Sequence, residues 1–178
     1  VPMRSVSSRS SGVLLHPTAL PGAGGCGTFG QASYDWVNLL ARSGVGVWQF
    51  LPVASPVSTG SPYSSPSGSA LNPWLLDADA LMADGFLSEG AYAAACERLP
   101  PVPVVGAMAL ELMPRRSEAL GQALAQCWPG QPASSHQAFD RWCRQQRHWL
   151  KDHCRFMVIR RLYANQPWWD WPRPLAQH

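Results

Sequence analysis

A single tyrosine, Tyr63, stands among hydroxyl and amide side chains in a long stretch without charge, residues 53–73. A tyrosine offers a flat ring and a polar tip, while serine and asparagine both donate and accept hydrogen bonds. The hydrogen-bonding side chains of this stretch include Ser61, Ser64, Ser65 and Asn72. The combination suits a neutral ligand rich in hydroxyl groups, such as a sugar.

A flexible serine- and proline-rich linker is the competing interpretation of residues 53–73. The stretch, however, runs directly into Trp74, Leu75 and Leu76, whose large apolar side chains need burial. Loops longer than about 12–15 residues inside compact domains are usually either functional or disordered. The apolar end of this one favours a ligand-binding loop.

The segment before this loop predicts the strand that positions it. Residues 45–51 are short, apolar and rich in β-branched and aromatic side chains, and they lie between Gly44 and Pro52. A strand that is apolar on both faces indicates a parallel sheet covered on both sides. Residues 12–16 predict a first strand and residues 31–42 a helix, which makes a βαβ unit with parallel strands. The loop then follows the carboxyl end of a parallel strand, where β/α folds place binding sites.

Three glycines after the first predicted strand, Gly22, Gly24 and Gly27, fit the spacing of a dinucleotide-binding turn. Five residues intervene between strand and motif, and the second strand ends in apolar residues instead of the acid that binds a ribose. Nucleotide binding is therefore disfavoured. The other interpretation is a tight loop whose backbone approaches another segment closely.

The second half of the sequence predicts helices. Asp77 or Asp79 caps one short helix, Ser88 caps another, a looser pattern covers residues 107–127, and one long helix covers residues 137–163. Basic residues along one side of the last helix are typical of a solvated face, so nucleic-acid binding is disfavoured. The chain closes on three tryptophans within residues 167–172, which predict either an aromatic platform for sugars or a packing anchor.

Composition limits the other classes of function. The 178 residues carry 14% charged side chains and a net charge of +3, which argues only weakly for a polyanionic partner. His148 and His153 lie five apart and no cysteine pair has C-x-x-C spacing, so we expect neither a metal nor a cofactor. We interpret the five cysteines as reduced core thiols of a cytoplasmic protein. No apolar run reaches the ~18 residues of a membrane span, and residues 1–10 are expected to be disordered.

Several motifs, taken together and in order, resemble one known family. They are HPTALPG from residue 16, VWQFLP from residue 47, GSPYSS from residue 60, NPWLLDADAL from residue 72, WLKDHCRFM from residue 149 and QPWWDWP from residue 166. They resemble the N-terminal part of 4-α-glucanotransferases, the amylomaltase or disproportionating-enzyme family.

The resemblance implies an eight-stranded β/α (TIM-type) barrel with a helical subdomain, of which this chain carries an incomplete part. We expect a tail at residues 1–10, a βαβ part of the barrel with the substrate loop at residues 11–87, and a mainly helical subdomain at residues 88–178. The implied reaction is transfer of α-1,4-glucan segments between malto-oligosaccharides with retention at the anomeric carbon. It needs two carboxyl groups about 5–5.5 Å apart. In the family these come from later strands, so no catalytic residue is expected in this chain and the segment alone is expected to be inactive.

Carried over position by position, the resemblance implies that Tyr63 and Ser61 bind substrate and that His16 and Asn72 shape the loops around it. Four positions depart from the family pattern, namely Ser58, Gly60, Pro66 and Ser69. They put the finer sugar contacts and a secondary glucan site in doubt. A non-catalytic module that binds glucan or regulates another protein is the alternative function.

Overall fold

The computed structural model describes residues 9–22, 25–57, 60–97, 99 and 107–176, and these form two compact units. One unit combines residues 1–66 with residues 71–131, and the other combines residues 67–70 with residues 132–178. The domain boundary expected at residue 87 falls inside the first unit. Most of the expected tail at residues 1–10, together with Gly24 and Ser58, lies outside the described residues.

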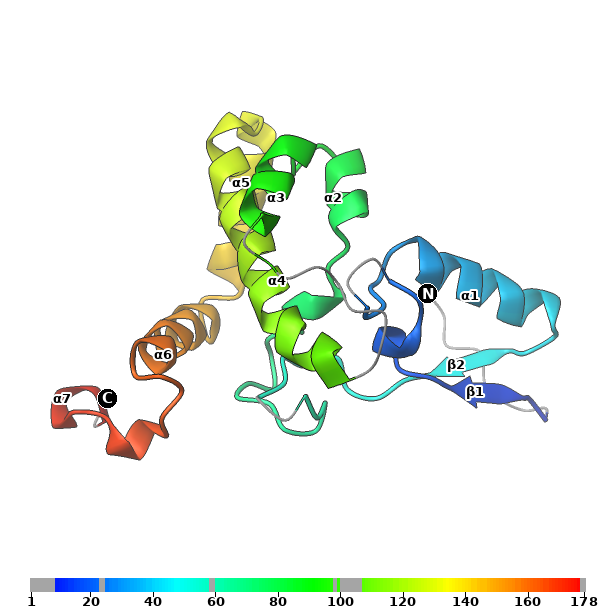
Figure 1. Ribbon diagram of the computed structural model, residues 1–178, viewed down its shortest axis with the longest axis horizontal. Helices are drawn as coiled ribbons and strands as arrows, with labels where there is room; N and C mark the ends of the chain where they lie inside the picture. The colour runs from blue at the N-terminus through cyan, green and yellow to red at the C-terminus, as the bar shows by residue number, and fades with distance from the viewer. Residues whose placement is uncertain (1–8, 23–24, 58–59, 98, 100–106, 177–178) are drawn as a thin grey trace. The chain divides into compact units, whose positions relative to one another are not determined.

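The first unit begins with the expected βαβ arrangement (Figure 1). Strand β1 (Gly12–Leu14) and strand β2 (Val47–Gln49) pair in parallel, with Gly12 opposite Val47 and Leu14 opposite Gln49. Helix α1 (Gln31–Arg42) connects them and ends before Gly44, whose positive φ of 71° suits the glycine predicted there. The parallel pairing predicted from the sequence is confirmed.

The strand predicted over residues 45–51 is shorter than expected and is not buried on both faces. Val47 is 45% exposed, Phe50 is 41% exposed, and Leu14 on the neighbouring strand is 58% exposed. The physical reason is that the sheet of the described residues has only two strands, so each strand has one free edge and few covering neighbours. The expectation of a strand buried on both faces is therefore wrong for this structure.

Helices α2 (Ala78–Ala83), α3 (Glu89–Cys96) and α4 (Ala107–Cys127) build the core of the first unit. Leu87, Leu120 and Ala123 form the buried centre, and side chains of all three helices pack around it. Asp77 caps α2 and Ser88 caps α3 through hydrogen bonds to Ala80 N and Ala91 N. The sequence did not decide between Asp77 and Asp79 as the N-cap of this helix, and in the structure Asp77 is the N-cap. A 3-10 turn, η3 (Trp128–Gly130), follows α4.

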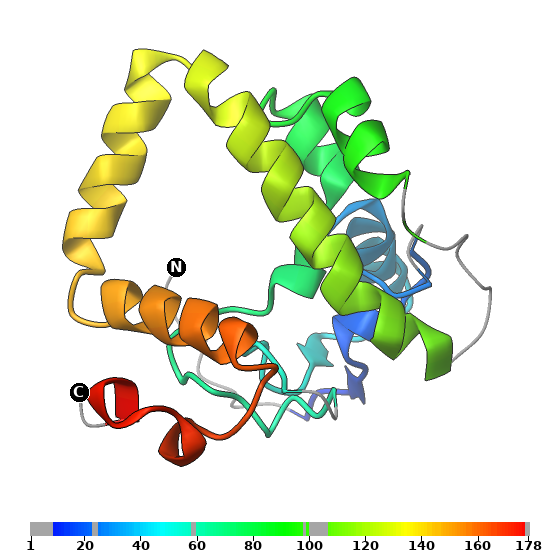
Figure 2. The same ribbon diagram turned by 60° about the vertical axis from the view of Figure 1, so that its left-hand side comes forward.

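The second unit corrects the long helix expected over residues 137–163. Two helices, α5 (Ala133–Gln145) and α6 (Leu150–Leu162), meet at a bend (Figure 2). The apolar stripe is interrupted there by Gln146, whose backbone carbonyl accepts from Leu150 N at 3.0 Å. Its side-chain oxygen accepts from Trp149 Nε1 at 2.8 Å. The Gln146–Leu150 bond keeps helical spacing, but the backbone of Gln146 leaves helical geometry (φ −92°, ψ 7°), so the 3.5-residue periodicity continues across a break in the helix.

The second unit ends in a 3-10 turn, η4 (Trp168–Asp170), and a short helix, α7 (Arg173–Ala176). The five cysteines are unpaired, but their environments differ, since Cys26 is buried and Cys154 is exposed. The description of all five as core thiols is therefore wrong for Cys154. Within the described residues, no helix has both the length and the apolar composition needed to cross a membrane.

Candidate functional site

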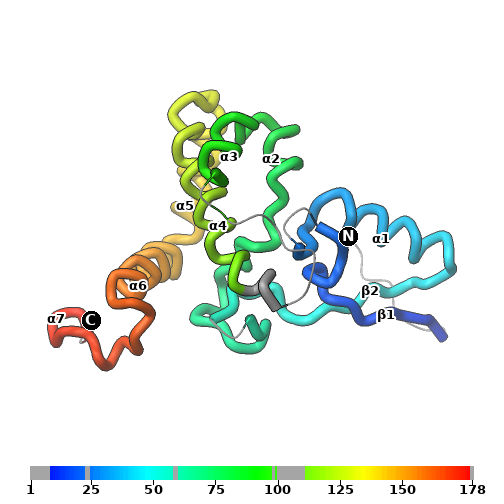
Figure 3. Tube along the Cα trace, in the orientation of Figure 1, coloured from blue at the N-terminus to red at the C-terminus, as the bar shows by residue number. Residues whose placement is uncertain are grey.

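A long loop follows β2 (Figure 3). Tyr63 lies in a hydrogen-bonded turn of this loop. Ser64 N donates to Ser61 O at 3.1 Å and Val57 N donates to Ser64 O at 2.9 Å. Proline at position 62 supplies the backbone angle that favours such a turn. The Tyr63 side chain is 72% exposed, so the turn presents the ring and its hydroxyl group to solvent.

The loop is tied together at its base. Asn72 N donates to Val53 O at 2.8 Å, and Ala54 and Leu71 form an isolated antiparallel bridge. The backbone at the two ends of the loop is therefore paired, as in a compact Ω-type loop. We call this pairing of residues 53–54 with residues 71–72 the neck of the loop. It disagrees with the flexible-linker interpretation, because the ends of a random-coil linker are not paired.

His16 and Asn72 occupy equivalent places in two similar turns. Each precedes a proline that opens a 3-10 turn, η1 (Pro17–Ala19) and η2 (Pro73–Leu75) respectively. Asn72 Oδ1 accepts from Trp74 N at 3.0 Å, and His16 Nδ1 accepts from Thr18 N at 3.4 Å. The Thr18 hydroxyl also lies 2.7 Å from His16 Nδ1. Sequence reasoning missed Thr18, although its position two residues after a capping side chain is typical of such turns.

Burial favours the neutral form of the His16 ring. Burial lowers its pKa below the ordinary value of 6.5, and a backbone interaction with Pro52 opposes the shift. With Nδ1 accepting hydrogen bonds, the ring proton sits on Nε2. That nitrogen is buried and makes no hydrogen bond of good geometry within the described part of the chain.

Both capped turns line one cavity of about 420 Å³ in the first unit. Its walls include His16, Thr18, Leu20, Cys26, Leu51, Gly60, Pro62, Asn72 and Trp74. Pro62 belongs to the turn that carries Tyr63, so the cavity begins beside that turn. Ser61 and Tyr63 are not among the residues that line it. The volume falls within the range of small-molecule sites in proteins.

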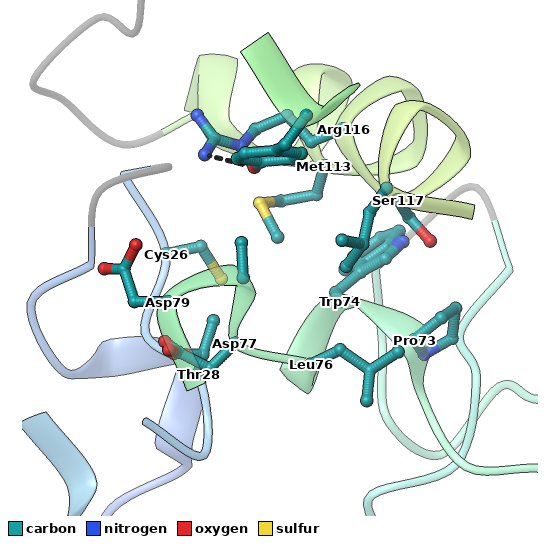
Figure 4. A pocket seen from close by; sticks show the side chains of 13 residues that line it. Cys26, Thr28, Pro73, Trp74, Leu76, Asp77, Asp79, Met113, Arg116 and Ser117 are labelled. Carbon is teal, nitrogen blue, oxygen red and sulfur yellow. Dashed lines mark hydrogen bonds between the residues drawn. The ribbon is translucent and has the colours of Figure 1, made fainter. Parts of the chain in front are cut away.

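A smaller cavity of about 110 Å³ is structural in character (Figure 4). Two acids line it, but Asp77 Oδ1 accepts from Ala80 N, and Asp77 Oδ2 accepts from Thr28 Oγ1 at 2.5 Å. Both carboxylate oxygens are therefore occupied, one in capping α2 and the other in a bond to the loop before α1, so Asp77 is not available as a nucleophile. On the opposite wall, Arg116 donates to the Tyr92 hydroxyl at 3.1 Å.

The thiol of Cys26, which lines both cavities, is equally unsuited to nucleophilic chemistry. Burial raises its pKa, and a hydrogen bond with Thr18 opposes this. Since the thiolate is the reactive form, a buried thiol with a raised pKa is inert. Within the part of the chain that the structure describes, no three metal-binding side chains gather into a possible ion site.

The glycine-rich loop packs against its own neighbouring backbone. A side chain at Gly27 would overlap the carbonyl oxygen of Pro17, and one at Gly22 would overlap that of Cys26. Gly27 N donates to Thr18 O at 3.1 Å. Close backbone approach, the second interpretation of these glycines, is confirmed at the two described positions.

Comparison with known proteins identifies the family. The family profile described as 4-alpha-glucanotransferase matches residues 15–178. A 4-alpha-glucanotransferase from Synechocystis is 32% identical over 171 residues, which cover 96% of this chain and 33% of that protein. The corresponding protein from Thermus thermophilus is 31% identical over 171 residues, covering 95% and 32%.

A solved structure agrees with these sequence matches. It is described as amylomaltase from Streptococcus agalactiae in complex with acarbose, and it matches with a TM-score of 0.74 at 31% identity. The match covers 92% of this chain and 32% of that one. The chain thus spans about a third of the length of the relatives that it matches. On the evidence of the profile and the structural match, the chain belongs to the 4-alpha-glucanotransferase family.

Proposed function

We propose that this chain is the N-terminal part of an enzyme that transfers α-1,4-glucan segments between malto-oligosaccharides. The family match across residues 15–178 is the observation that carries the proposal. The complete enzyme would be a cytoplasmic protein of starch, glycogen and maltose metabolism, with this chain supplying the first βαβ part of an eight-stranded β/α barrel. The two exposed edges of the β1–β2 pair leave room for further strands of such a barrel.

In this proposal Tyr63 and Ser61 contact the sugar, while His16 and Asn72 hold the loops in shape. The exposed position of Tyr63 on a hydrogen-bonded turn supports the first role, because the backbone that carries the ring is held in place and the ring is not covered. The backbone hydrogen bonds accepted by Asn72 and His16 support the second.

The reaction breaks one glycosidic bond and forms another, so it requires a carboxylate nucleophile and a carboxylic acid on opposite sides of the scissile bond. Three of the described acids are already engaged in other contacts. Asp77 is committed to two hydrogen bonds, Asp35 accepts from Gln31, and Asp152 pairs with Arg155 at 3.7 Å on one helix. The catalytic pair is therefore assigned to the part of the enzyme outside this chain.

The first test compares the 178-residue chain with the full-length protein on maltotriose. The full-length protein should release glucose and form longer oligomers, whereas the chain alone should match a heat-inactivated control. Transfer by the chain alone would contradict the assignment of the carboxylates. Failure of the full-length protein on every malto-oligosaccharide would remove the proposed function and favour a non-catalytic glucan-binding module.

The second test concerns Tyr63 in the full-length protein. A ring contact and a hydrogen bond are each worth on the order of 1–3 kcal/mol, so Tyr63→Ala should lower kcat/KM roughly ten- to a few-hundredfold. Tyr63→Phe keeps the ring and should lose less. Tyr34, which is 66% exposed on α1, provides a matched control, and Tyr34→Ala should leave kcat/KM unchanged. Normal kcat/KM in Tyr63→Ala would remove this residue from the site.

A further inference from the structure

The three closing tryptophans divide into one buried and two exposed side chains. Trp171 is 6% exposed and its Nε1 donates to Gln166 O at 3.1 Å. Its ring lies 5.5 Å from that of Phe156 and 6.1 Å from that of Tyr163, measured between centroids. Trp171 therefore packs the segment onto the end of α6.

Trp168 and Trp169 lie outside this packing. They are 50% and 65% exposed, and their rings are 5.6 Å apart at an interplanar angle of 79°. Within the described residues neither indole N–H makes a hydrogen bond. Pro167 and Pro172 flank the turn, and the restricted proline backbone limits its alternatives. The backbone that carries the two rings is thus restricted, the rings contact each other, and much of their surface faces solvent.

We propose that Trp168 and Trp169 form a surface site for the polymeric α-1,4-glucan substrate, a site that depends on the function proposed above because its ligand is that substrate. The apolar C–H face of a glucose ring packs on an indole, and the indole N–H donates to a sugar hydroxyl. An α-1,4-linked chain is curved, so its successive rings are not coplanar. Two indoles inclined to each other fit such a chain better than two parallel ones.

The charges beside the pair favour a neutral ligand. One acid, Asp170, and one base, Arg173, flank the tryptophans, and both are exposed, so the local net charge is zero. Within residues 166–173 a polyanion such as a nucleic acid would therefore meet no excess of basic side chains. The exposed amide of Gln166 adds a donor and an acceptor for sugar hydroxyls.

The function of such a site is to retain long chains. A second attachment point raises the effective concentration of a polymer near the protein, whereas a trisaccharide is too short to gain from it. The proposal therefore predicts a chain-length dependence that a purely structural role would not produce.

The test uses the full-length protein as wild type, as the double variant Trp168→Ala/Trp169→Ala and as Leu162→Ala. Leu162 is 75% exposed in the same unit and controls for the loss of exposed apolar surface. Affinity for amylopectin is measured by retardation in native gels, and transfer is measured on maltotriose. The double variant should bind amylopectin about tenfold or more weakly with an unchanged KM for maltotriose, and Leu162→Ala should match the wild type in both.

Unchanged amylopectin affinity in a folded double variant would overturn the proposal. A second result would also overturn it. If the double variant melts at a clearly lower temperature and acrylamide does not quench these tryptophans in the wild type, the rings are covered by the rest of the protein. The double variant Trp168→Phe/Trp169→Phe, which retains aromatic rings, should keep most of the affinity. Absence of maltotriose transfer in the wild type would refute the proposed function and leave the gel measurement to decide the site separately.

Discussion

The turns that begin at His16 and Asn72 have the same backbone conformation but bury different side chains. In the first turn Pro17 and Leu20 are buried and Ala19 is exposed. In the second, Asn72 and Leu75 are buried and Leu76 is 48% exposed. The capping hydrogen bond and the following proline thus fix the local conformation without fixing which side of the turn faces the core.

The neighbours of each turn decide that orientation. Leu75 O accepts from Phe29 N at 2.9 Å, and η2 packs against α4, so the second turn belongs to the helical core. The first turn packs instead on the glycine loop, where Gly27 N donates to Thr18 O. We therefore expect these two similar local motifs to contribute unequally to the free energy of unfolding.

The largest expected difference comes from truncating the buried leucine of the second turn. Leu75 is 4% exposed, so Leu75→Ala should lower the free energy of unfolding by about 2–5 kcal/mol. The neighbouring Leu76→Ala should change it by less than about 0.5 kcal/mol, because that side chain is half exposed. Urea denaturation of the two variants measures the contrast, and equal losses would show that the two leucines are packed alike.

A smaller loss is expected where the first turn meets the glycine loop. The added methyl group of Gly27→Ala would overlap Pro17 O and would lie 2.7 Å from Leu20 O, both backbone atoms that cannot move aside cheaply. We expect a cost of about 1–3 kcal/mol, as for other overpacked sites. Gly46→Ala is the control, since a methyl group there meets nothing within 4 Å. Thermal melting distinguishes the two, and an unshifted melting temperature for Gly27→Ala would contradict the close approach.

Removing either capping side chain should lower the free energy of unfolding, but by unequal amounts. Asn72→Ala loses a 3.0 Å hydrogen bond at a buried position and should cost about 1–2 kcal/mol. His16→Ala should cost less, because its bond to Thr18 N is 3.4 Å and the side chain is only part-buried. Chemical denaturation measures the stability lost by each variant. A larger loss for His16→Ala would contradict this order and show that the cap of the first turn contributes more to stability.

The smallest effect is a pH dependence confined to the first turn. Because burial lowers the pKa of His16 below 6.5, the unfolded chain binds the proton more readily than the folded one. The contribution of His16 to stability should be fully present above pH 6.5 and lost as the pH falls through its folded pKa. His16→Asn copies the cap of the second turn without a titrating group. The difference in stability between wild type and His16→Asn should therefore shrink or reverse on acidification, and a constant difference would contradict the lowered pKa.

Sequence patterns predicted the elements that local chemistry determines. The bounds of α1, the Gly44 terminus, the Ser88 cap and the parallel strands all follow from side-chain types and spacing within short windows. The family resemblance, which depends on several motifs in order, was equally accessible. The Thr28–Asp77 bond was not, because it joins residues 49 positions apart that no periodicity relates.

Features that depend on long-range packing were mispredicted for the same reason. The apolar composition of residues 45–51 indicates burial, but burial needs neighbouring strands, and the described sheet has only two. The bend at Gln146 carries no glycine or proline, so a continuous heptad-like pattern concealed it. Tyr63 was singled out from its type and context, yet only the three-dimensional turn shows that its ring is exposed.

The paired neck of the Tyr63 loop also has an evolutionary consequence. Asn72 N to Val53 O and the Ala54–Leu71 bridge close the loop at its base, so the scaffold is indifferent to much of what lies between. Closing a loop twice as long costs only about 0.6 kcal/mol more. Insertions and deletions between residues 55 and 69 can therefore accumulate with little penalty to folding. The sequence of this loop is therefore free to diverge while the paired residues at its base and the two capped turns stay the same.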